Sequence, residues 1–377
     1  MKVTAVKITP LLVPYKKPYY WAQGIIHGAE VLLVAVETDA GITGYGESIA
    51  SPDALAVAGF LAKAGAMCVG RDPFDNARLM ANAYHALFQA LGTCSAPRFG
   101  GQVLAGLEMA LWDVMGKAAG RPVHQLLGGA VHDKLQYFGF AMGETAEEVA
   151  AEATAFVQEG VATIYLKVGR GDALDLKTVA AVRAAIGPEI RLRVDANEKW
   201  TPVRARRMID RMADLGVEMV EQPTPSDSLA ALAQVRASSP VAIGADQVNF
   251  TPEDVAATLA ADAADLIVLG VHETGGLTRF IKAGRIAEAT GVDVCIHGLY
   301  ETGITTCAAH QAGAVLPNLD DANQYMNHFL EWDILAGPDL ALNNGSLPVL
   351  TGPGLGFELD LEAVARAATL WRTTFDG

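Results

Sequence analysis

The chain has 377 residues, 51% of them apolar, which is enough for one large hydrophobic core or two ordinary ones. Its formal net charge of −15 makes a nucleic-acid partner unexpected, because phosphate binding needs clustered Lys and Arg. No run approaches the roughly 18–20 apolar residues that span a bilayer, and no signal-peptide pattern opens the chain. We therefore expect a cytoplasmic protein with neither a membrane nor a nucleic-acid partner.

The N-terminal part, residues 1–125, is predicted to form a small α+β domain. Strand-like runs come first, and turn residues join them. Helical stretches follow around 52–66, 73–91 and 101–119. The four cysteines show no Cys-x-x-Cys spacing and no disulfide framework, so we expect free, buried thiols at Cys68, Cys94, Cys295 and Cys307.

From about residue 134 the sequence repeats a pattern in which short β-branched runs alternate with Ala-rich segments typical of amphipathic helices. About eight such units, each of about 25–30 residues, are what a (β/α)8 barrel requires. A doubly wound open sheet is the alternative, but no GxGxxG follows a first strand. We therefore predict an α/β fold with a TIM-type barrel over 126–339, capped by the N-terminal domain. The last segment, 340–377, is expected to return to that domain.

The ends of the predicted barrel strands carry polar side chains, and barrel active sites lie at these ends. Asp195, Glu221 and Asp246 end strands 3 to 5, with spacings of 221 − 195 = 26 and 246 − 221 = 25 residues. Because neighbouring strands lie roughly 4.8 Å apart, these carboxylates should converge and repel one another. A single such residue would more often cap the next helix. Three in register predict a site for Mg²⁺, with Mn²⁺ as the alternative.

Two further strand ends could exchange protons with a substrate. Lys167 ends strand 2 on the same face as Tyr165, and His297 ends strand 7. Each alone would more often be a structural polar residue. Beside a divalent cation, however, the charged form of Lys is disfavoured, so its pKa should fall toward the range of a general base. The set predicts removal of the proton next to a substrate carboxylate, with the resulting enediolate stabilised by the metal.

At these residues the sequence resembles the mandelate racemase and muconate lactonizing enzymes of the enolase superfamily, over the whole chain. GLEMALWDVMGKAAGRPVHQLLGG (106–129) is similar to the family's domain-junction helix, and RVDANEKW, VEQP and GADQ to its metal-ligand strands. ETGGL (273–277) resembles its strand-6 loop and PGLGFELD (353–360) its C-terminal segment. The resemblance implies two capping loops, Tyr19 to His27 and Ser48 to Asp53, that close over the barrel and carry specificity.

The resemblance also implies roles for residues around the metal. Asn197 would support the metal ligands through hydrogen bonds. Asp320 or Asp321, after strand 8, could contact the substrate carboxylate. In the first capping loop, substrate contact and ordinary packing remain equal alternatives for Tyr20, Trp21 and His27.

The chain departs from the family pattern in two places. The family's Lys-x-Lys reads Tyr165-Leu166-Lys167, so the second lysine, which usually transfers the proton, is kept. The strand-6 Lys of the cycloisomerase branch is replaced by Glu273. The strand-6 Asp that supports the strand-7 His in the racemase branch is replaced by Gly270. Glu273 then orients His297, binds substrate, or is a solvated loop acid.

The resemblance implies an isomerase with a small carboxylate substrate, and muconate cycloisomerase-like activity ranks first. A dehydratase or epimerase acting on an acid sugar, hydroxy acid or amino acid is the alternative. Loss of a predicted metal ligand or of Lys167 would favour a non-catalytic metal- or acid-binding relative, but the sequence keeps all of these residues. An aldolase or hydrolase barrel predicts a Schiff-base Lys on another strand or His-rich ligands. Members of the family are often dimeric or octameric, so we expect a homo-oligomer.

Overall fold

The structure, a computed structural model, describes residues 1–89 and 95–375. Its N-terminal part is a three-stranded antiparallel sheet in the order β1-β2-β3, with helices packed against it. The elements are β1 (Val3–Trp21), β2 (Gly24–Thr38), β3 (Thr43–Ile49), α1 (Ala54–Cys68), a 3-10 turn (Pro73–Asp75), α2 (Asn76–Phe88), α3 (Pro97–Ala119) and α4 (Val123–Leu126). Valine and leucine on β2, the central strand, are buried between the helices and the rest of the molecule.

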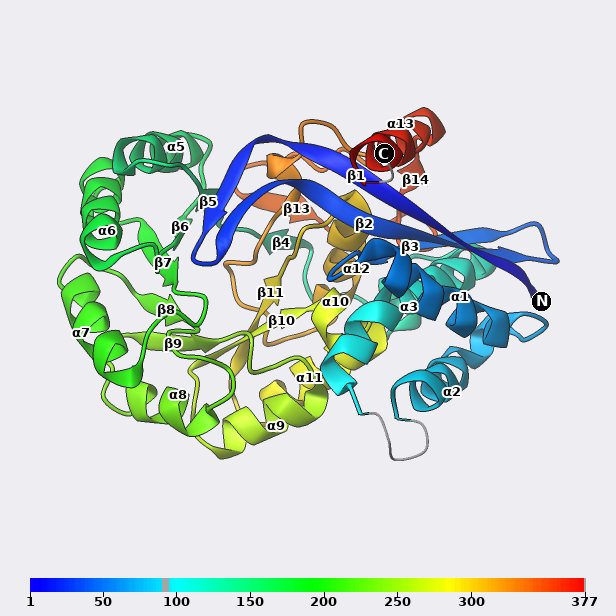
Figure 1. Ribbon diagram of the computed structural model, residues 1–377, viewed down its shortest axis with the longest axis horizontal. Helices are drawn as coiled ribbons and strands as arrows, with labels where there is room; N and C mark the ends of the chain where they lie inside the picture. The colour runs from blue at the N-terminus through cyan, green and yellow to red at the C-terminus, as the bar shows by residue number, and fades with distance from the viewer. Residues whose placement is uncertain (90–94, 376–377) are drawn as a thin grey trace.

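The second part is a curled sheet of seven parallel strands with helices outside it (Figure 1). The strands, in spatial order, are β5 (Gly139–Ala141), β6 (Thr163–Lys167), β7 (Arg191–Asp195), β8 (Met219–Glu221), β9 (Ala242–Ala245), β10 (Leu266–Gly270) and β11 (Asp293–His297). The helices are α5 (Ala146–Gln158), α6 (Asp172–Ile186), α7 (Pro202–Ala213), α8 (Leu229–Arg236), α9 (Pro252–Ala260), α10 (Val271–Thr274), α11 (Leu277–Ala289) and α12 (Gly303–Gly313). This confirms the predicted TIM-type barrel with an N-terminal cap.

The barrel closes without a regular eighth strand. Leu319 forms an isolated parallel bridge with Val294 of β11, and Asn323 forms another with Tyr137 at the other edge. The Asn323 side chain accepts a hydrogen bond from the Ile296 N–H (2.8 Å) and donates one to the Gln136 carbonyl oxygen (2.9 Å). The sequence of this segment, with Pro, Asn and two Asp, is poor in strand formers. Hydrogen bonds of the Asn323 side-chain amide therefore replace part of the backbone hydrogen bonding that an eighth strand would provide.

Threonines start several of the helices that follow the barrel strands. Thr145 forms a capping box with Glu148 at α5, and Thr201, Thr251 and Thr302 accept hydrogen bonds from the first turns of α7, α9 and α12. Because each cap ends its loop at a defined residue, the preceding strand end is held at a fixed place on the rim of the barrel.

The C-terminal segment returns to the N-terminal sheet, where α13 (Leu361–Phe375) packs on β1. The Trp371 indole donates a hydrogen bond to Glu30 of β2 (2.7 Å). The boundaries at 125 and 339 remain predictions. Two short two-stranded sheets lie outside the barrel sheet: β4 (Lys134–Gln136) pairs with β13 (Ser346–Pro348), and β12 (Leu335–Gly337) pairs with β14 (Glu358–Leu359). A 3-10 turn covers Asn327–Phe329.

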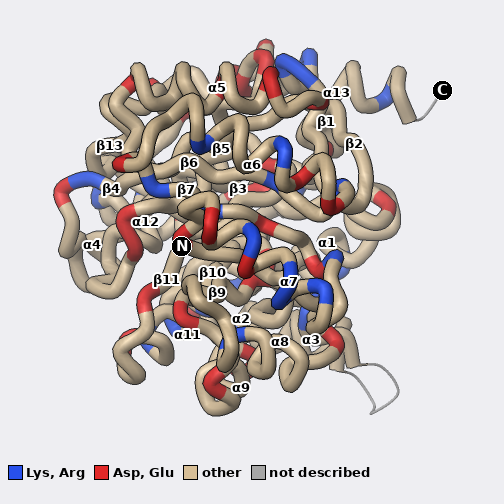
Figure 2. Tube along the Cα trace, turned by 90° about the vertical axis from the view of Figure 1, so that its left-hand side faces the viewer, with Lys and Arg blue, Asp and Glu red and all other residues tan. Residues whose placement is uncertain are grey.

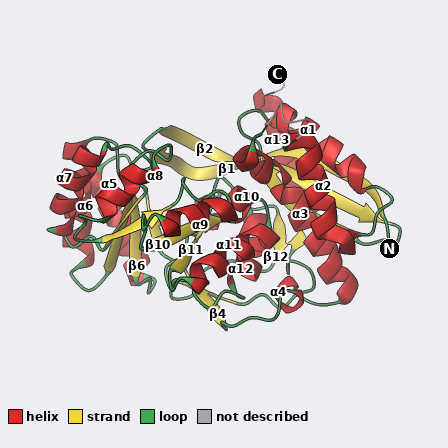
Figure 3. Cartoon of the chain, turned by 90° about the horizontal axis from the view of Figure 1, so that it is seen from below, coloured by secondary structure: helices red, strands yellow, loops and turns green. Residues whose placement is uncertain are grey.

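The hairpin of β1 and β2 reaches from the cap across the barrel, so that its tip lies beside β5 (Figures 1 and 3). Lys17 fixes this tip: its amine donates to the Met142 carbonyl oxygen (2.8 Å) and pairs with Glu152 (2.6 Å). Tyr19 packs edge-on against Phe140 and Phe329. The hairpin is thus anchored on the barrel as well as on the cap.

Charged residues of both signs are interspersed along the chain in Figure 2. Ion pairs join neighbouring barrel helices; Asp172 of α6, for example, binds Arg204 (2.5 Å) and Arg207 (2.8 Å) of α7. Among the described residues, no single helix is long and apolar enough to cross a membrane. The segments Ala54–Cys68 and Pro73–Phe88 are long and apolar enough only when taken together, and the chain bends by 117° between them. Cys68, Cys295 and Cys307 are buried free thiols as expected, and Cys94 lies outside the described residues.

Candidate active site

Strand register brings the predicted site residues to one end of the barrel. Lys167 of β6 is the register partner of Asp195 on β7, and Asp195 is the partner of Glu221 on β8. Asp246 directly follows β9, and His297 ends β11. All five side chains are buried.

The three predicted metal-ligand carboxylates differ in what they contact. The donor atoms of Glu221, Asp246 and His297 all lie within 4.8 Å of one another. Asp195 instead accepts hydrogen bonds from the Lys167 amine (2.5 Å), the Tyr165 hydroxyl (2.9 Å) and the Asn197 N–H (2.7 Å). Lys167 and Tyr165 therefore compete with a metal for the Asp195 carboxylate, a contact that strand spacing cannot predict.

The buried oxygens of this group fit a divalent cation. Within the described residues, one Glu221 oxygen, both Asp246 oxygens and the Asn197 amide oxygen are buried without a hydrogen-bond partner. Burial and the neighbouring Asp195 raise the pKa of Glu221 to about 8. Burial, together with Glu273 and Glu221, raises that of Asp246 against the opposing effect of His297. Uncompensated buried carboxylates are costly, and a hard cation with oxygen ligands would offset that cost.

Lys167 and His297 line the same cavity, of about 170 Å³. Burial lowers the pKa of Lys167, but Asp195 and Glu221 outweigh it and raise the pKa above its usual value. The predicted fall beside a cation is thus opposed by the carboxylates of the protein. Burial likewise lowers the pKa of His297, yet Asp246 and Glu273 raise it to about 10. His297 Nδ1 lies 2.9 Å from Glu273 Oε2, and Nε2 lies 3.7 Å from Asp246 Oδ2.

The first capping loop forms one wall of this cavity, but not with all three predicted residues. Trp21 lines it, whereas Tyr20 stacks under the Arg170 guanidinium (5.2 Å) and His27 is exposed. Tyr19 and Gln23 of the same predicted loop also line the cavity, although they were not singled out. The wall residues that the sequence analysis missed are Gln102, Gln247, Phe250, Leu299, Tyr300 and Met326. Strand alternation from Trp21 could have identified Tyr19, and adjacency to Asp246 could have identified Gln247.

The second capping loop lines an adjoining cavity of about 320 Å³ with Ile49, Ala50, Ser51 and Pro52. This cavity shares Gln102, Leu299 and Tyr300 with the first. Both loops implied by the resemblance therefore border the region around Tyr300.

The structure does not bring Asp320 and Asp321 to the site. Asp320 pairs with Arg193 inside the barrel wall, and its N–H donates to the Val294 carbonyl oxygen near the start of β11. Asp321 pairs with Arg191, the first residue of β7, at 2.7 Å. Both therefore lie toward the opposite end of the strands, because the loop before them follows a helix rather than a strand.

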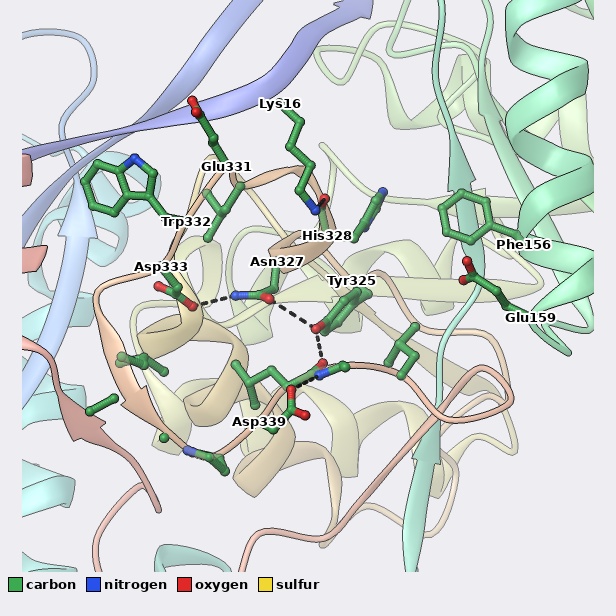
Figure 4. A pocket seen from close by; sticks show the side chains of 18 residues that line it. Lys16, Phe156, Glu159, Tyr325, Asn327, His328, Glu331, Trp332, Asp333 and Asp339 are labelled. Carbon is green, nitrogen blue, oxygen red and sulfur yellow. Dashed lines mark hydrogen bonds between the residues drawn. The ribbon is translucent and has the colours of Figure 1, made fainter.

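A larger cavity, of about 710 Å³, lies beneath the loop from Tyr325 to Leu342 (Figure 4). Three of its polar side chains are bonded in a chain: the Tyr325 hydroxyl donates to Asn327, and the Asn327 amide donates to Asp333 (2.5 Å). Reactive groups gather in the smaller cavity instead, so size does not identify the active site here.

Comparison with known proteins agrees with this geometry. Residues 3–128 match the mandelate racemase / muconate lactonizing enzyme N-terminal domain, and residues 148–364 match the enolase C-terminal domain-like family. The chain is 29% identical to the L-Ala-D/L-Glu epimerase of Bacillus subtilis (94% of this chain, 96% of that one). It is also 29% identical to muconate cycloisomerase 1 of Rhodococcus opacus (97% and 98%).

Among solved structures, a dipeptide epimerase from Enterococcus faecalis in complex with Mg and L-Leu-L-Tyr superposes with a TM-score of 0.87. It shares 27% identity, and the match covers 95% of this chain and 100% of that one. Two epimerases and a cycloisomerase thus match nearly the full length of the chain. The chain belongs to the mandelate racemase / muconate lactonizing enzyme family of the enolase superfamily.

Proposed function

We propose that this enzyme is a Mg²⁺-dependent epimerase or racemase that inverts the carbon next to a carboxylate. The observation that carries the proposal is the presence of two proton carriers in one cavity. Lys167 enters it from β6 and His297 from β11, and four strands separate these in the sheet. Two carriers on well-separated strands can serve the two faces of one carbon, as inversion requires.

In this scheme, a cation held by the carboxylates would offset their effect on the pKa of Lys167 and favour its neutral form. Lys167 then accepts the α-proton of one stereoisomer at Nζ, and His297 donates a proton from Nε2 to the other face. The reverse reaction exchanges these roles. The Tyr165 hydroxyl and the Asn197 N–H donate hydrogen bonds to Asp195 and fix its carboxylate. Asp195, Glu221 and Asp246 would together bind the cation. Bound Mg²⁺ would neutralise the negative charge that develops on the substrate carboxylate.

The charge of the cavity supports a substrate with a single carboxylate. Among the described residues that line it, Lys167 and His297 are the basic side chains, and Lys167 is already bonded to Asp195. The remaining wall is made of aromatic rings, amides, the apolar residues Gly298, Leu299 and Met326, and the acid Glu273. A second anionic group would therefore meet no free cation, whereas a neutral or cationic remainder would be accepted.

Cycloisomerisation is the second candidate, because the match to muconate cycloisomerase 1 spans 97% of the chain. A single Lys suffices for proton transfer in that reaction, so it leaves His297 without a required role. Muconate has two carboxylates, which the cavity does not favour. The two reactions differ in whether the substrate is inverted or closed into a ring.

The test is incorporation of deuterium at the α-carbon in D₂O with Mg²⁺, followed by NMR and mass spectrometry. Both stereoisomers of amino, hydroxy and dipeptide acids would be compared with dicarboxylates. Wild type should exchange and interconvert the stereoisomers; Lys167→Ala should lose exchange from one and His297→Asn from the other. Lys177→Ala, at an exposed position on α6, is the matched control. Exchange that survives without Lys167, or a product formed by loss of water or ring closure, would overturn the proposal.

A further inference from the structure

We infer that Glu273 is the positioning residue of His297, and that position 270 is glycine because the Glu273 carboxylate occupies the space of its side chain. The inference rests on the proposed function, in which His297 carries a proton. It makes one functional unit of Gly270, Glu273 and His297.

The backbone places position 270 directly beside His297. Gly270 is the last residue of β10, and its register partner on β11 is His297. Side chains of paired residues on parallel strands point to the same face, so a residue at 270 would project alongside the imidazole. A β-carbon built there would overlap the Glu273 carboxylate. The carboxylate therefore reaches His297 only across a glycine.

Glu273 reaches this place from the single helical turn α10. The turn is fixed at several points: Thr274 Oγ1 donates to the Gly270 carbonyl oxygen (2.8 Å), and the Gly276 N–H donates to that of Val271 (2.8 Å). His272 Nε2 lies 2.9 Å from the Glu47 carbonyl oxygen. The Glu273 side chain, 2% exposed, therefore approaches His297 from a rigid support.

The hydrogen bond sets which imidazole nitrogen faces the cavity. Glu273 Oε2 lies 2.9 Å from His297 Nδ1, and a carboxylate can only accept, so Nδ1 carries the hydrogen. Nε2 is then directed toward the Asp246 side of the site, 3.7 Å from that carboxylate. Rotation of the ring would break a buried charge-assisted bond, which keeps Nε2 as the proton-transferring atom.

The first arm of the test is kinetic. Glu273→Ala should reduce exchange of the stereoisomer served by His297 about 100-fold, the scale of a positioned acid–base group, and spare exchange of the stereoisomer served by Lys167. Gly270→Asp alone should lose the same activity, because its side chain overlaps Glu273. Combined, Gly270→Asp with Glu273→Ala should recover at least tenfold of the loss, since the introduced Asp can then replace Glu273 as the acceptor for the Nδ1 side of the ring. Glu301→Gln is the control: this buried acid is not bonded to His297.

The second arm needs no substrate. In ¹⁵N-labelled protein, the Nδ1–H signal that disappears in His297→Asn should be protected from solvent exchange in wild type. It should lose protection in Glu273→Ala and regain it in the double variant. Equal exchange of both stereoisomers by Glu273→Ala, or a protected signal that persists in it, would overturn the inference. If wild type exchanged no acid, the proposed function would fail, while the NMR signal would still decide whether Glu273 holds His297.

Discussion

Glu108 joins the cap to the barrel, and its removal should destabilise both. This residue of α3 is 2% exposed and accepts five hydrogen bonds: from the N–H groups of Leu277 (2.8 Å) and Thr278 (3.2 Å), the Thr278 hydroxyl (2.5 Å), the Trp112 indole (2.7 Å) and the Asn76 amide (3.4 Å). Leu277 begins α11, and the preceding Gly276 offers no side-chain cap. A side chain of the N-terminal domain therefore forms the N-terminal cap of helix α11 in the barrel.

The size of the effect follows from these contacts. In Glu108→Ala the fully buried Leu277 N–H loses its acceptor, which costs about 1–3 kcal/mol, and the loss of a helix cap costs about 1 kcal/mol. Thr278 and Trp112 are partly exposed, so water can replace their bonds. The sum is about 3 kcal/mol. For 377 residues the entropy of unfolding is about 0.8 kcal/mol/K, so Tm should fall by about 4 °C.

The assay is urea unfolding with calorimetry, on wild type, Glu108→Ala and Glu108→Gln. Glu108→Gln keeps the volume and one acceptor oxygen, so about half the loss is expected. Glu358→Ala, at an exposed position on β14, serves as the control and should change stability by less than about 0.5 kcal/mol. A Glu108→Ala variant within about 1 kcal/mol of wild type would show that the Leu277 N–H finds another partner, and would refute the reasoning.

Three further outcomes follow from the site and the core. Mg²⁺ at about 100 times its Kd should stabilise wild type by about 2.7 kcal/mol, and EDTA or Asp246→Asn should abolish the shift in a thermal-melting assay. Trp21→Ala should raise KM about tenfold, equivalent to about 1.4 kcal/mol of apolar contact, in the exchange assay. Burial lowers the pKa of His310 from 6.5 to about 4, so the unfolded chain binds the proton more tightly. As the pH falls from 7 to 4.5, the free energy of unfolding of wild type should therefore decrease by about 2 kcal/mol more than that of His310→Gln, measured by urea unfolding.

Strand spacing predicted which polar residues meet, because each strand–helix unit has nearly constant length and every strand ends on the same rim. Lys167, Asp195 and Glu221 are register neighbours for this reason. What spacing cannot encode is the direction of a side chain after packing. The turn of Asp195 toward Lys167, and the reach of Glu273 over Gly270, depend on contacts between side chains of different units.

Irregular segments were the other limit. The pairing of β1 with β2 shifts register between Pro14 and Tyr19, and beyond this shift the sequence singled out Tyr20 where Tyr19 lines the cavity. After α12 the chain closes the barrel through isolated bridges, and counting strand ends there placed Asp320 at the wrong end. Both errors arise where hydrogen bonds leave the regular ladder.

The packing of α13 on β1 has a consequence for the order of folding. Strand β1 is made first, yet its partners include Leu330, through an isolated bridge with Tyr15, and the last helix of the chain. Trp371 and Glu30 are separated by 341 positions. Contacts of such sequence separation form late and slow the folding of a domain. During synthesis the barrel units can therefore form before the N-terminal sheet acquires its final cover from α13.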